Sequence, residues 1–171
     1  MTDPFIPLHI ALLTVSDTRD HANDRSGTVL YDLATADGHK IIDRSIVADD
    51  HSAIVSCLSK WIANPEIDVI ISTGGTGLTG RDVTPEAFES FYDKPIPGFG
   101  ELFRWLSYAK IGAATIQSRA TAGLAGGTYL FALPGSPSAC RDGWEMILRP
   151  QLDSRTKPCN FVSLMPRLSE K

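Results

Sequence analysis

The sequence predicts an α/β fold: a three-layer α/β/α sandwich around a mainly parallel, Rossmann-like sheet. Short apolar runs alternate with amphipathic stretches along the chain, which is the order of successive β-α units. The runs 9–15 and 67–73 are almost continuously apolar, as is typical of strands that are buried on both faces. Because helical patterns separate these runs, the connections are expected to cross over and make the strands parallel.

Five elements are expected in the first half of the chain. They are, in order, a strand at 9–15, a helix at 28–38, a strand at 40–47, a helix at 51–63 and a strand at 67–73. Gly38 supplies a stop for the first helix, and Asp50 or Ser52 can cap the second. The strand "KIIDRSIV" is less apolar than the others and is therefore expected nearer to a sheet edge.

The second half has a weaker pattern. Thr84, Pro85 and Glu86 have the residue types of a helix start, with threonine as N-cap, proline as first helical residue and glutamate near the positive end of the dipole. The stretch "KPIPGFG" interrupts the chain after that helix. The remaining elements are expected to be a helix at 101–112, a turn at 126–127, a strand at 129–133, a helix at 141–152 and an arm at 158–171. Together they predict a single domain, 1–171.

Composition narrows the class of protein. A length of 171 residues suits one domain, and a net charge of −4 argues against a nucleic-acid partner, which usually calls for a basic face. No apolar run is long enough to span a bilayer, and "MTDPFIPLHI" has an acid where a signal peptide carries positive charge. Cys57, Cys140 and Cys159 form no C-x-x-C motif, so neither a zinc site nor a thioredoxin motif is indicated. We expect a cytoplasmic protein with reduced thiols.

Polar residues follow the expected strands at the point where each one ends. In a parallel sheet these loops meet at the carboxyl edge, where ligands usually bind. The residues that this topology brings together are Ser16, Asp17, Asp24 and Ser26 after the first strand, Asp49 and Asp50 after the second, Arg81 and Asp82 after the third, and Gly135 and Ser136 after the last.

The stretch "ISTGGTGLTGRDVTPEAF" carries four glycines between a strand and a helix. Glycines there let backbone N–H groups approach an anion beside a helix N-terminus; alternatively, they only serve positive φ angles. If Gly75 serves the ligand, alanine there should block binding without strain. The pattern is neither a P-loop nor G-x-G-x-x-G, which disfavours a nicotinamide cofactor. The expected ligand-binding residues of this loop are Thr73, Gly74, Gly75, Thr76 and Gly77.

Two acids, Asp49 and Asp82, border this expected anion site. Each could simply cap a helix or complement its dipole. Carboxylates repel phosphate, however, and a divalent cation between them would reconcile the two, with Mg²⁺ suited to oxygen ligands and nucleotide phosphates. Arg81 is either a solvated surface charge or a bidentate hydrogen-bond donor to a phosphate. His51, next to Asp50, is more often a bystander than a base.

These residues stand in motifs that resemble a known family. "TGGTGLTGRDVTPEA" is similar to the signature of the molybdenum cofactor biosynthesis proteins of the MoaB/MogA type, whose domain also occurs in gephyrin and the plant Cnx proteins. The blocks "ALLTVSDTR", "NDRSG", "IVADD", "PGFGELFR" and "LPGSPSAC" also resemble family blocks in the family order. The likeness covers nearly the whole chain, and "PQLDSRTKPCNF" resembles the MoaB branch.

The resemblance implies a trimeric or hexameric protein that binds molybdopterin and, in active members, adenylylates it with Mg-ATP. The essential acids of the family match Asp49 and Asp82, its ligand loop matches Gly74 to Gly77, and the loop serines Ser16 and Ser136 are plausible additions. Some MoaB-branch proteins have lost the first acid and the activity. This chain retains Asp49, although Ala48 stands where many active members carry proline.

Two alternatives to a molybdopterin adenylyltransferase stay open at this point. One is a catalytically silent molybdopterin-binding or scaffold protein of the same family. The other is a generic nucleotide-binding, flavodoxin-like protein, which the two carboxylates disfavour because a flavin phosphate would not need them.

The stretch "GFGELFRWLSYAKIG" predicts how the chain assembles. Its apolar residues cover more than one face of a helix, which indicates either deep burial or an interface between copies. The family resemblance favours the interface. These residues are Phe99, Leu102, Phe103, Trp105, Leu106, Tyr108 and Ile111.

Overall fold

Residues 4–170 are described by the structure, a computed structural model, and within them six strands form one sheet in the order β2-β1-β3-β6-β5-β4. The parallel strands are β1 (His9–Val15), β2 (Lys40–Val47), β3 (Val69–Thr73) and β6 (Thr128–Leu133). The strands β5 (Thr121–Ala125) and β4 (Lys94–Pro95) are antiparallel to their neighbours. The mainly parallel sheet confirms the predicted fold class, and β2 lies at the edge, as expected.

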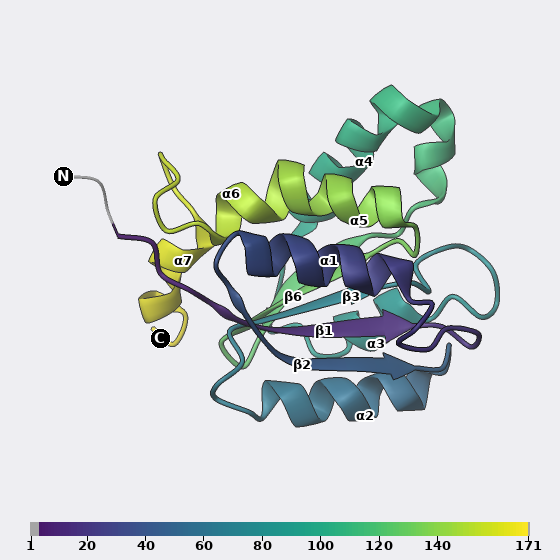
Figure 1. Cartoon of the computed structure of the whole chain (residues 1–171), viewed down its shortest axis with the longest axis horizontal. Coiled ribbons are helices and arrows are strands. Elements are labelled where there is room, and N and C mark those ends of the chain that lie inside the picture. The colour runs from purple at the N-terminus through teal and green to yellow at the C-terminus, as the bar shows by residue number, and fades with distance from the viewer. Residues whose placement is uncertain (1–3, 171) are drawn as a thin grey trace.

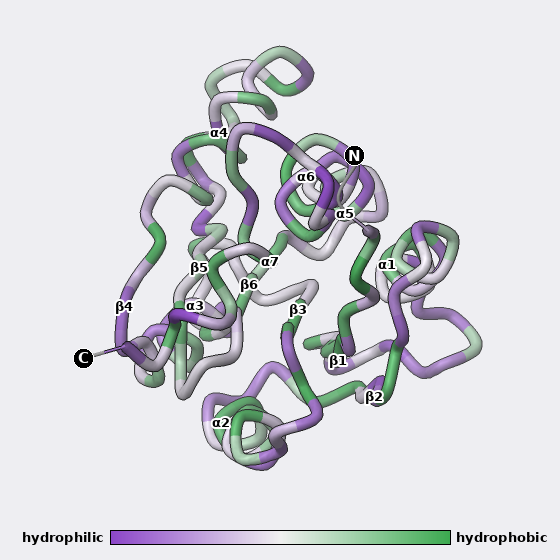
Figure 2. Tube along the Cα trace, turned by 90° about the vertical axis from the view of Figure 1, so that its left-hand side faces the viewer, coloured by the Kyte–Doolittle hydropathy of each residue, from purple (hydrophilic) through white to green (hydrophobic). Residues whose placement is uncertain are grey.

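Helices cover both faces of this sheet (Figure 1). On one side lie α2 (His51–Ile62) and α3 (Thr84–Glu89). The other side carries α1 (Arg25–Ala36), α4 (Pro97–Ile111), α5 (Pro137–Gly143), a π-helical turn (Trp144–Leu148), α6 (Arg149–Leu152) and α7 (Phe161–Leu164). Short 3-10 helices span Gly112–Gln117 and Met165–Arg167. Figure 2 shows α4 at the periphery, beside the β5 and β4 edge.

Side chains of neighbouring strand residues divide between two cores, one on each face. Leu12 of β1 packs with Phe131 and Trp144, whereas the next residue, Leu13, packs with Phe88 on the opposite face. This alternation follows from the period of two in a strand. It explains why the central strands read as continuous apolar runs.

The starts of α1 and α3 differ from the sequence-based expectations, whereas the start of α2 agrees with them. α1 begins at Arg25 instead of 28 because Asp24 accepts a hydrogen bond of 2.9 Å from the Gly27 N–H. α3 has Val83 as its N-cap, so the prediction of Thr84 as cap is wrong. The Thr84 hydroxyl instead donates to the Gly74 carbonyl at 2.9 Å. Asp50 caps α2, as expected, by accepting from the Ala53 N–H at 2.8 Å.

Two helices of the second half start earlier than expected. α4 starts at Pro97, within "KPIPGFG", instead of at 101, and α5 starts at Pro137, within "PGSPSAC", instead of at 141. Proline suits the first turn of a helix because the N–H it lacks would have no partner there. Ser136 caps α5 by accepting from the Ala139 N–H at 3.2 Å.

The strand β5 was not predicted from the sequence. It forms a hairpin with β6 through Gly126 and Gly127, whose φ angles are +57° and +91°. This confirms the predicted turn. Positive φ at both positions is the geometry that glycine accommodates at no steric cost.

The C-terminal segment packs against the sheet. Phe161 lies with its ring centroid 4.8 Å from that of Tyr129, and Val162 is buried. The Tyr129 hydroxyl donates to the Phe161 carbonyl at 3.2 Å. The segment expected as an arm contains the short helices Phe161–Leu164 and Met165–Arg167, and α7 contributes to the core. Within residues 4–170, no helix has the length and apolar character needed to cross a membrane.

His39, at the start of β2, makes stability depend on pH. Its ring is buried, and Nδ1 accepts the Leu8 N–H at 3.2 Å, as only a neutral imidazole can. Burial lowers its pKa, although the charges of Asp37 and Asp153 act to raise it. The unfolded chain therefore binds a proton more readily, so the stabilising effect of the neutral ring is present above a pH of about 6.5 and is lost below it.

We expect the free energy of unfolding to fall between pH 7.5 and 5.5, and to fall less in His39→Asn. The asparagine side chain has an oxygen that can accept the Leu8 N–H and does not titrate. Urea unfolding of both proteins at the two pH values measures the difference. An identical pH dependence in both would contradict the assignment to His39.

Candidate functional site

The loops that follow β1, β2, β3 and β6 meet at the carboxyl edge of the sheet and enclose a pocket of about 370 Å³. A second pocket of about 430 Å³ lies beside it, and Gly75 and Gly135 line both. Of the residues predicted for the site, the first pocket is lined by Ser16, Asp49, Thr73, Gly74, Gly75 and Gly135, and the second by Gly75, Thr76, Gly77, Asp82, Gly135 and Ser136. Arg81 lines neither of these two pockets.

The glycine loop has a backbone that depends on glycine at two positions. Gly74 and Gly75 have φ angles of +102° and +65°, and a Cβ added to them would lie 2.2 Å from the Val15 carbonyl oxygen and 2.4 Å from Thr84 Oγ1, respectively. The expectation that alanine at Gly75 would cause no strain is therefore wrong. The positive-φ interpretation holds for both glycines, and it leaves the loop free to bind an anion as well.

Gly77 is constrained for another reason. Its φ is not positive, but an added Cβ would lie 2.8 Å from Asp82 Oδ2. In the same way, a Cβ on Gly75 would lie 3.2 Å from Asp49 Oδ1. The two carboxylates thus lie against the same loop, at glycines two positions apart.

Asp49 is held by a reciprocal pair of hydrogen bonds with Asp17. The Asp17 N–H donates to Asp49 Oδ2, and the Asp49 N–H donates to Asp17 Oδ1, both at 3.1 Å. Burial raises the pKa of Asp49, and the charge of Asp17 raises it further, which outweighs the lowering by the hydrogen bond from the Asp17 N–H and by the charge of Arg81. A cation close to the Asp49 carboxylate would therefore stabilise its ionised form.

Asp82 closes a tight turn in the glycine loop. Its Oδ2 accepts from the Thr79 N–H at 2.8 Å and from the Thr79 hydroxyl at 2.7 Å. Burial raises the pKa of this carboxyl, but the hydrogen bonds from Thr79 and from the backbone of Gly77, and the charge of Arg119, lower it more. Asp82 is therefore ionised more readily than Asp49.

Three arginines lie around the first pocket. Arg81 forms an ion pair with Asp17 and is otherwise mostly exposed. Arg19 and Arg25 line the pocket itself and were not predicted from the sequence. Their presence in "SDTRDHANDRSG", the loop that carries Ser16, is the signal that could have found them, because guanidinium groups beside a glycine loop suit phosphate.

A buried network fixes the floor of this pocket. Asp24 accepts from Thr14 Oγ1 at 2.7 Å and pairs with Arg44 at 2.9 Å. The Ser26 hydroxyl donates to the Gly135 carbonyl at 2.8 Å and so ties the first loop to the last. These bonds hold the pocket walls, and Arg44 neutralises the charge of Asp24.

The carboxylates of Asp49 and Asp82 suit a magnesium ion that is also coordinated by the phosphates of a nucleotide. Among residues 4–170, no three His, Cys, Asp or Glu side chains form a cluster that could hold a metal. Mg²⁺ at nucleotide sites, however, usually takes only one or two carboxylates, together with phosphate oxygens and waters. Asp49 and Asp82 at the glycine loop fit that description.

Comparison with known proteins identifies the family of the chain. Residues 11–154 match the family described as a probable molybdopterin binding domain. The molybdenum cofactor biosynthesis protein B of Escherichia coli (strain K12) is 51% identical over 157 residues, which is 92% of each chain.

Solved structures show the same likeness. A crystal structure of a molybdenum cofactor biosynthesis protein B is 39% identical with a TM-score of 0.84, over 86% of this chain and 92% of the other. The tungsten cofactor synthesizing protein MoaB from Pyrococcus furiosus is 34% identical with a TM-score of 0.76, over 84% and 91%. The chain belongs to the molybdopterin-binding domain family of molybdenum cofactor biosynthesis proteins and, within it, is similar to proteins of the MoaB type.

Proposed function

We propose that this protein binds molybdopterin and adenylylates it with Mg-ATP. The observation that carries the proposal is the position of Asp49 and Asp82 against one glycine loop, where Asp49 lines the first of two adjoining pockets and Asp82 lines the second. One pocket offers space for each of two phosphate-bearing substrates. The family match argues against the flavodoxin-like alternative.

In the proposed reaction, an oxygen of the molybdopterin phosphate attacks the α-phosphorus of ATP. A new P–O bond forms as the bond from the α-phosphorus to the bridging oxygen breaks, and pyrophosphate leaves with the electron pair. Such chemistry depends mainly on positioning and on neutralising charge. A magnesium ion held by Asp49 and Asp82 would supply part of that neutralisation.

The other residues bind and orient the substrates. The Gly74 N–H donates to the Leu133 carbonyl at 3.0 Å, and the backbone of Gly77 is hydrogen-bonded to the Asp82 carboxyl. Within the Gly74–Gly77 loop, the N–H groups of Gly75 and Thr76 would therefore bind phosphate oxygens beside the N-terminus of α3. Arg19 and Arg25, in the first pocket, would neutralise further phosphate charge, and Ser16 and Ser136 would donate hydrogen bonds. We also propose a cytoplasmic location, where the free thiols of Cys57, Cys140 and Cys159 would stay reduced.

Incubation with molybdopterin and Mg-ATP, with pyrophosphate release as the readout, tests the reaction. We expect release that requires all three components. Tight molybdopterin binding without pyrophosphate would instead show a catalytically silent binding protein, which is the alternative within the same family.

Alanine at Gly77 is expected to reduce adenylyl transfer on the order of tenfold or more, because it would displace the Asp82 carboxylate, and the metal-nucleotide that this carboxylate is proposed to hold would lose its alignment. The added Cβ would push the Asp82 carboxylate aside, which a flexible side chain can do at little cost to the fold. The melting temperature should fall only slightly, because the displaced carboxylate weakens its hydrogen bonds from Thr79.

Gly80→Ala is the matched control for this prediction. Gly80 lies in the same loop, and an added Cβ there would meet nothing within 4 Å. Transfer rates and melting curves of the two variants decide the matter. Equal rates in both would contradict a role for the position of Asp82.

We also propose that the chain assembles as a trimer or hexamer through α4. Trp105 on this helix is 73% exposed, which is unusual for so large an apolar side chain. Phe99 and Phe103, on the same helix, are buried against the sheet. The exposed apolar residues in and just after α4 are Leu102, Trp105, Tyr108, Ile111 and Ile116.

Light scattering is expected to show an oligomer in the wild type and a smaller species in Trp105→Glu, since a buried charge at an interface opposes association. Leu78→Glu serves as control, because Leu78 is also exposed but lies outside α4. A monomeric wild type at micromolar concentration would refute the obligate oligomer.

A further inference from the structure

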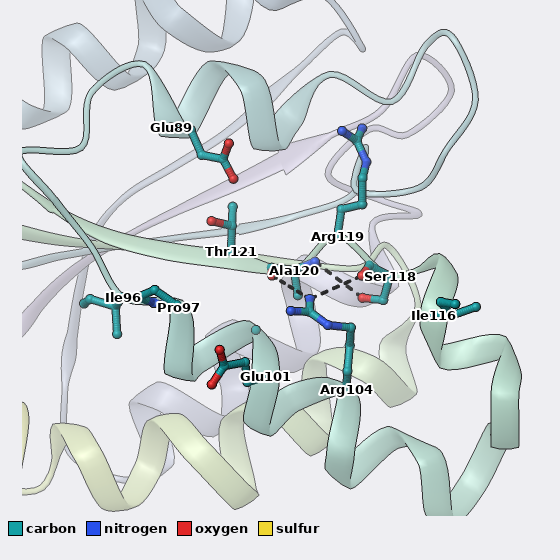
Figure 3. Close-up of a pocket in the computed structure, with 11 residues that line it drawn as sticks. Glu89, Ile96, Pro97, Glu101, Arg104, Ile116, Ser118, Arg119, Ala120 and Thr121 are labelled. Atoms are coloured by element: carbon teal, nitrogen blue, oxygen red, sulfur yellow. Dashed lines mark hydrogen bonds between the residues drawn. The ribbon is translucent and has the colours of Figure 1, made fainter.

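Arg119 lies just before β5 and reaches from a separate pocket to the glycine loop. That pocket, of about 460 Å³, lies between α4 and β5, and Arg104 and Arg119 line it (Figure 3). In the figure the Arg119 side chain points away from Arg104. Arg104 donates to the carbonyls of Ser118 and Ala120, whereas the contacts of Arg119 lie elsewhere.

The polar contacts of Arg119 all fall on the segment from Thr76 to Glu86. Its backbone N–H donates to the Thr76 carbonyl at 3.0 Å. Its side chain donates from Nε to the Gly77 carbonyl and from Nη2 to the Asp82 carbonyl, both at 2.7 Å. Nη1 pairs with the Glu86 carboxylate. One guanidinium thus joins two main-chain carbonyls that are five positions apart.

The loop between these carbonyls has little packing of its own. Leu78, its largest apolar side chain, is 67% exposed. Inside the loop, Asp82 and Thr79 are joined by the hydrogen bonds described above and by the Asp82 N–H, which donates to the Thr79 carbonyl at 3.0 Å. Segments with few buried contacts open readily unless polar contacts hold them. Arg119 supplies such contacts at both ends of the loop.

We propose that Arg119 is a positioning residue that closes the Gly77–Asp82 loop and thereby holds the Asp82 carboxylate against the glycines. This inference rests on the proposed function, which makes Asp82 a ligand of the metal-nucleotide. Arginine suits the task because its planar fork presents Nε and Nη2 to two acceptors at once. A lysine offers one point of charge and cannot reproduce the fork.

Hydrogen exchange of the wild type, Arg119→Gln, Arg119→Lys and Glu86→Gln tests the inference without any assay of activity. In Arg119→Gln, the amides of Thr79 and Asp82 are expected to exchange on the order of tenfold faster or more, since two charge-assisted hydrogen bonds are lost. Arg119→Lys should fall in between. The amide of Ile71 in β3 should exchange at nearly the wild-type rate.

Glu86→Gln is the matched control, because it removes the exposed ion pair and leaves both carbonyl contacts. It is expected to change exchange in the loop little, as exposed ion pairs contribute little. The inference is overturned if Arg119→Gln leaves the loop amides at wild-type rates, if it accelerates Ile71 by the same factor, or if Glu86→Gln matches it.

Kinetics separate positioning from substrate binding. In Arg119→Gln we expect kcat for adenylyl transfer to fall on the order of tenfold or more, with partial recovery in Arg119→Lys and a smaller change in KM for molybdopterin. An unchanged kcat would overturn the link to Asp82. A wild type without transfer activity would refute the proposed function, whereas the exchange rates would still decide whether Arg119 closes the loop.

Discussion

The substitutions Asp49→Asn and Asp82→Asn are each expected to lower adenylyl transfer by a factor on the order of a hundred or more, as when a charge-stabilising group is removed from a reaction centre. The fold should survive both changes. The amide oxygen introduced at position 49 can still accept the Asp17 N–H, and the one introduced at position 82 can still accept from Thr79. Only the negative charge that would hold the metal-nucleotide is lost.

The two variants should differ in stability, because the pKa values of the two acids shift in opposite directions. The pKa of Asp49 is raised in the folded protein, so its ionised form opposes folding at neutral pH, and Asp49→Asn should melt at or above the wild-type temperature. The pKa of Asp82 is lowered, so its charge favours folding above the pKa of the unfolded chain, and Asp82→Asn should melt slightly lower. A less active yet equally or more stable protein is typical of a functional acid.

Asp50→Asn is the control for these variants. Asp50 is the neighbour of Asp49 but caps α2 and lines neither pocket, and asparagine is an equally good cap. Steady-state pyrophosphate release and thermal melts of all three variants provide the data. Near-normal turnover in Asp49→Asn or Asp82→Asn would remove that acid from the proposed mechanism.

The parts of the fold that were predicted correctly are those whose signal lies within one short stretch of sequence. The runs 9–15 and 67–73 are apolar because helices cover both faces of the central strands. By contrast, β5 has the sequence "TAGLA", with small residues that carry little strand signal. The structure gives a reason for one of them: a Cβ on Gly123 would lie 2.3 Å from the Tyr92 ring. Such a constraint comes from tertiary packing and cannot be seen in the sequence alone.

The same distinction applies to the site. Asp49, Asp82 and the glycines could be selected because their residue types suit phosphate and metal, and because parallel topology brings strand ends together. The sequence places Asp17 in a loop at the same edge as Asp49, but it does not predict their reciprocal bonds, which join residues 32 positions apart. It does not predict the role of Arg119 either, because the bond from Arg119 to Asp82 spans 37 positions and the neighbours of Arg119 in sequence form no motif. Contacts between residues so far apart in sequence can be identified only in the folded structure.

Alanine at Gly74 is expected to lower the free energy of unfolding by about 3 kcal/mol or more, from a side chain at positive φ together with a steric clash. The clash is with the backbone of Val15, 2.2 Å from the added Cβ, so no rotamer change can relieve it. Either β1 or β3 must shift at its carboxyl end. The first pocket lies between those ends, and molybdopterin affinity should fall along with stability.

Gly127→Ala distinguishes the clash from the conformational strain. Gly127 also has a positive φ, +91°, but an added Cβ there would meet nothing within 4 Å, in the hairpin between β5 and β6. We expect it to cost about 1 kcal/mol and to leave molybdopterin affinity unchanged in titrations. If Gly74→Ala destabilised the protein no more than Gly127→Ala and bound molybdopterin as tightly, the contact between Gly74 and Val15 would have no part in shaping the pocket. Because the strands β1 and β3 are neighbours in register, Leu13 with Ser72 and Thr14 with Thr73, we expect the opposite: a bare backbone at Gly74 lets both strands end side by side, and the loops that bind the ligand start from that point.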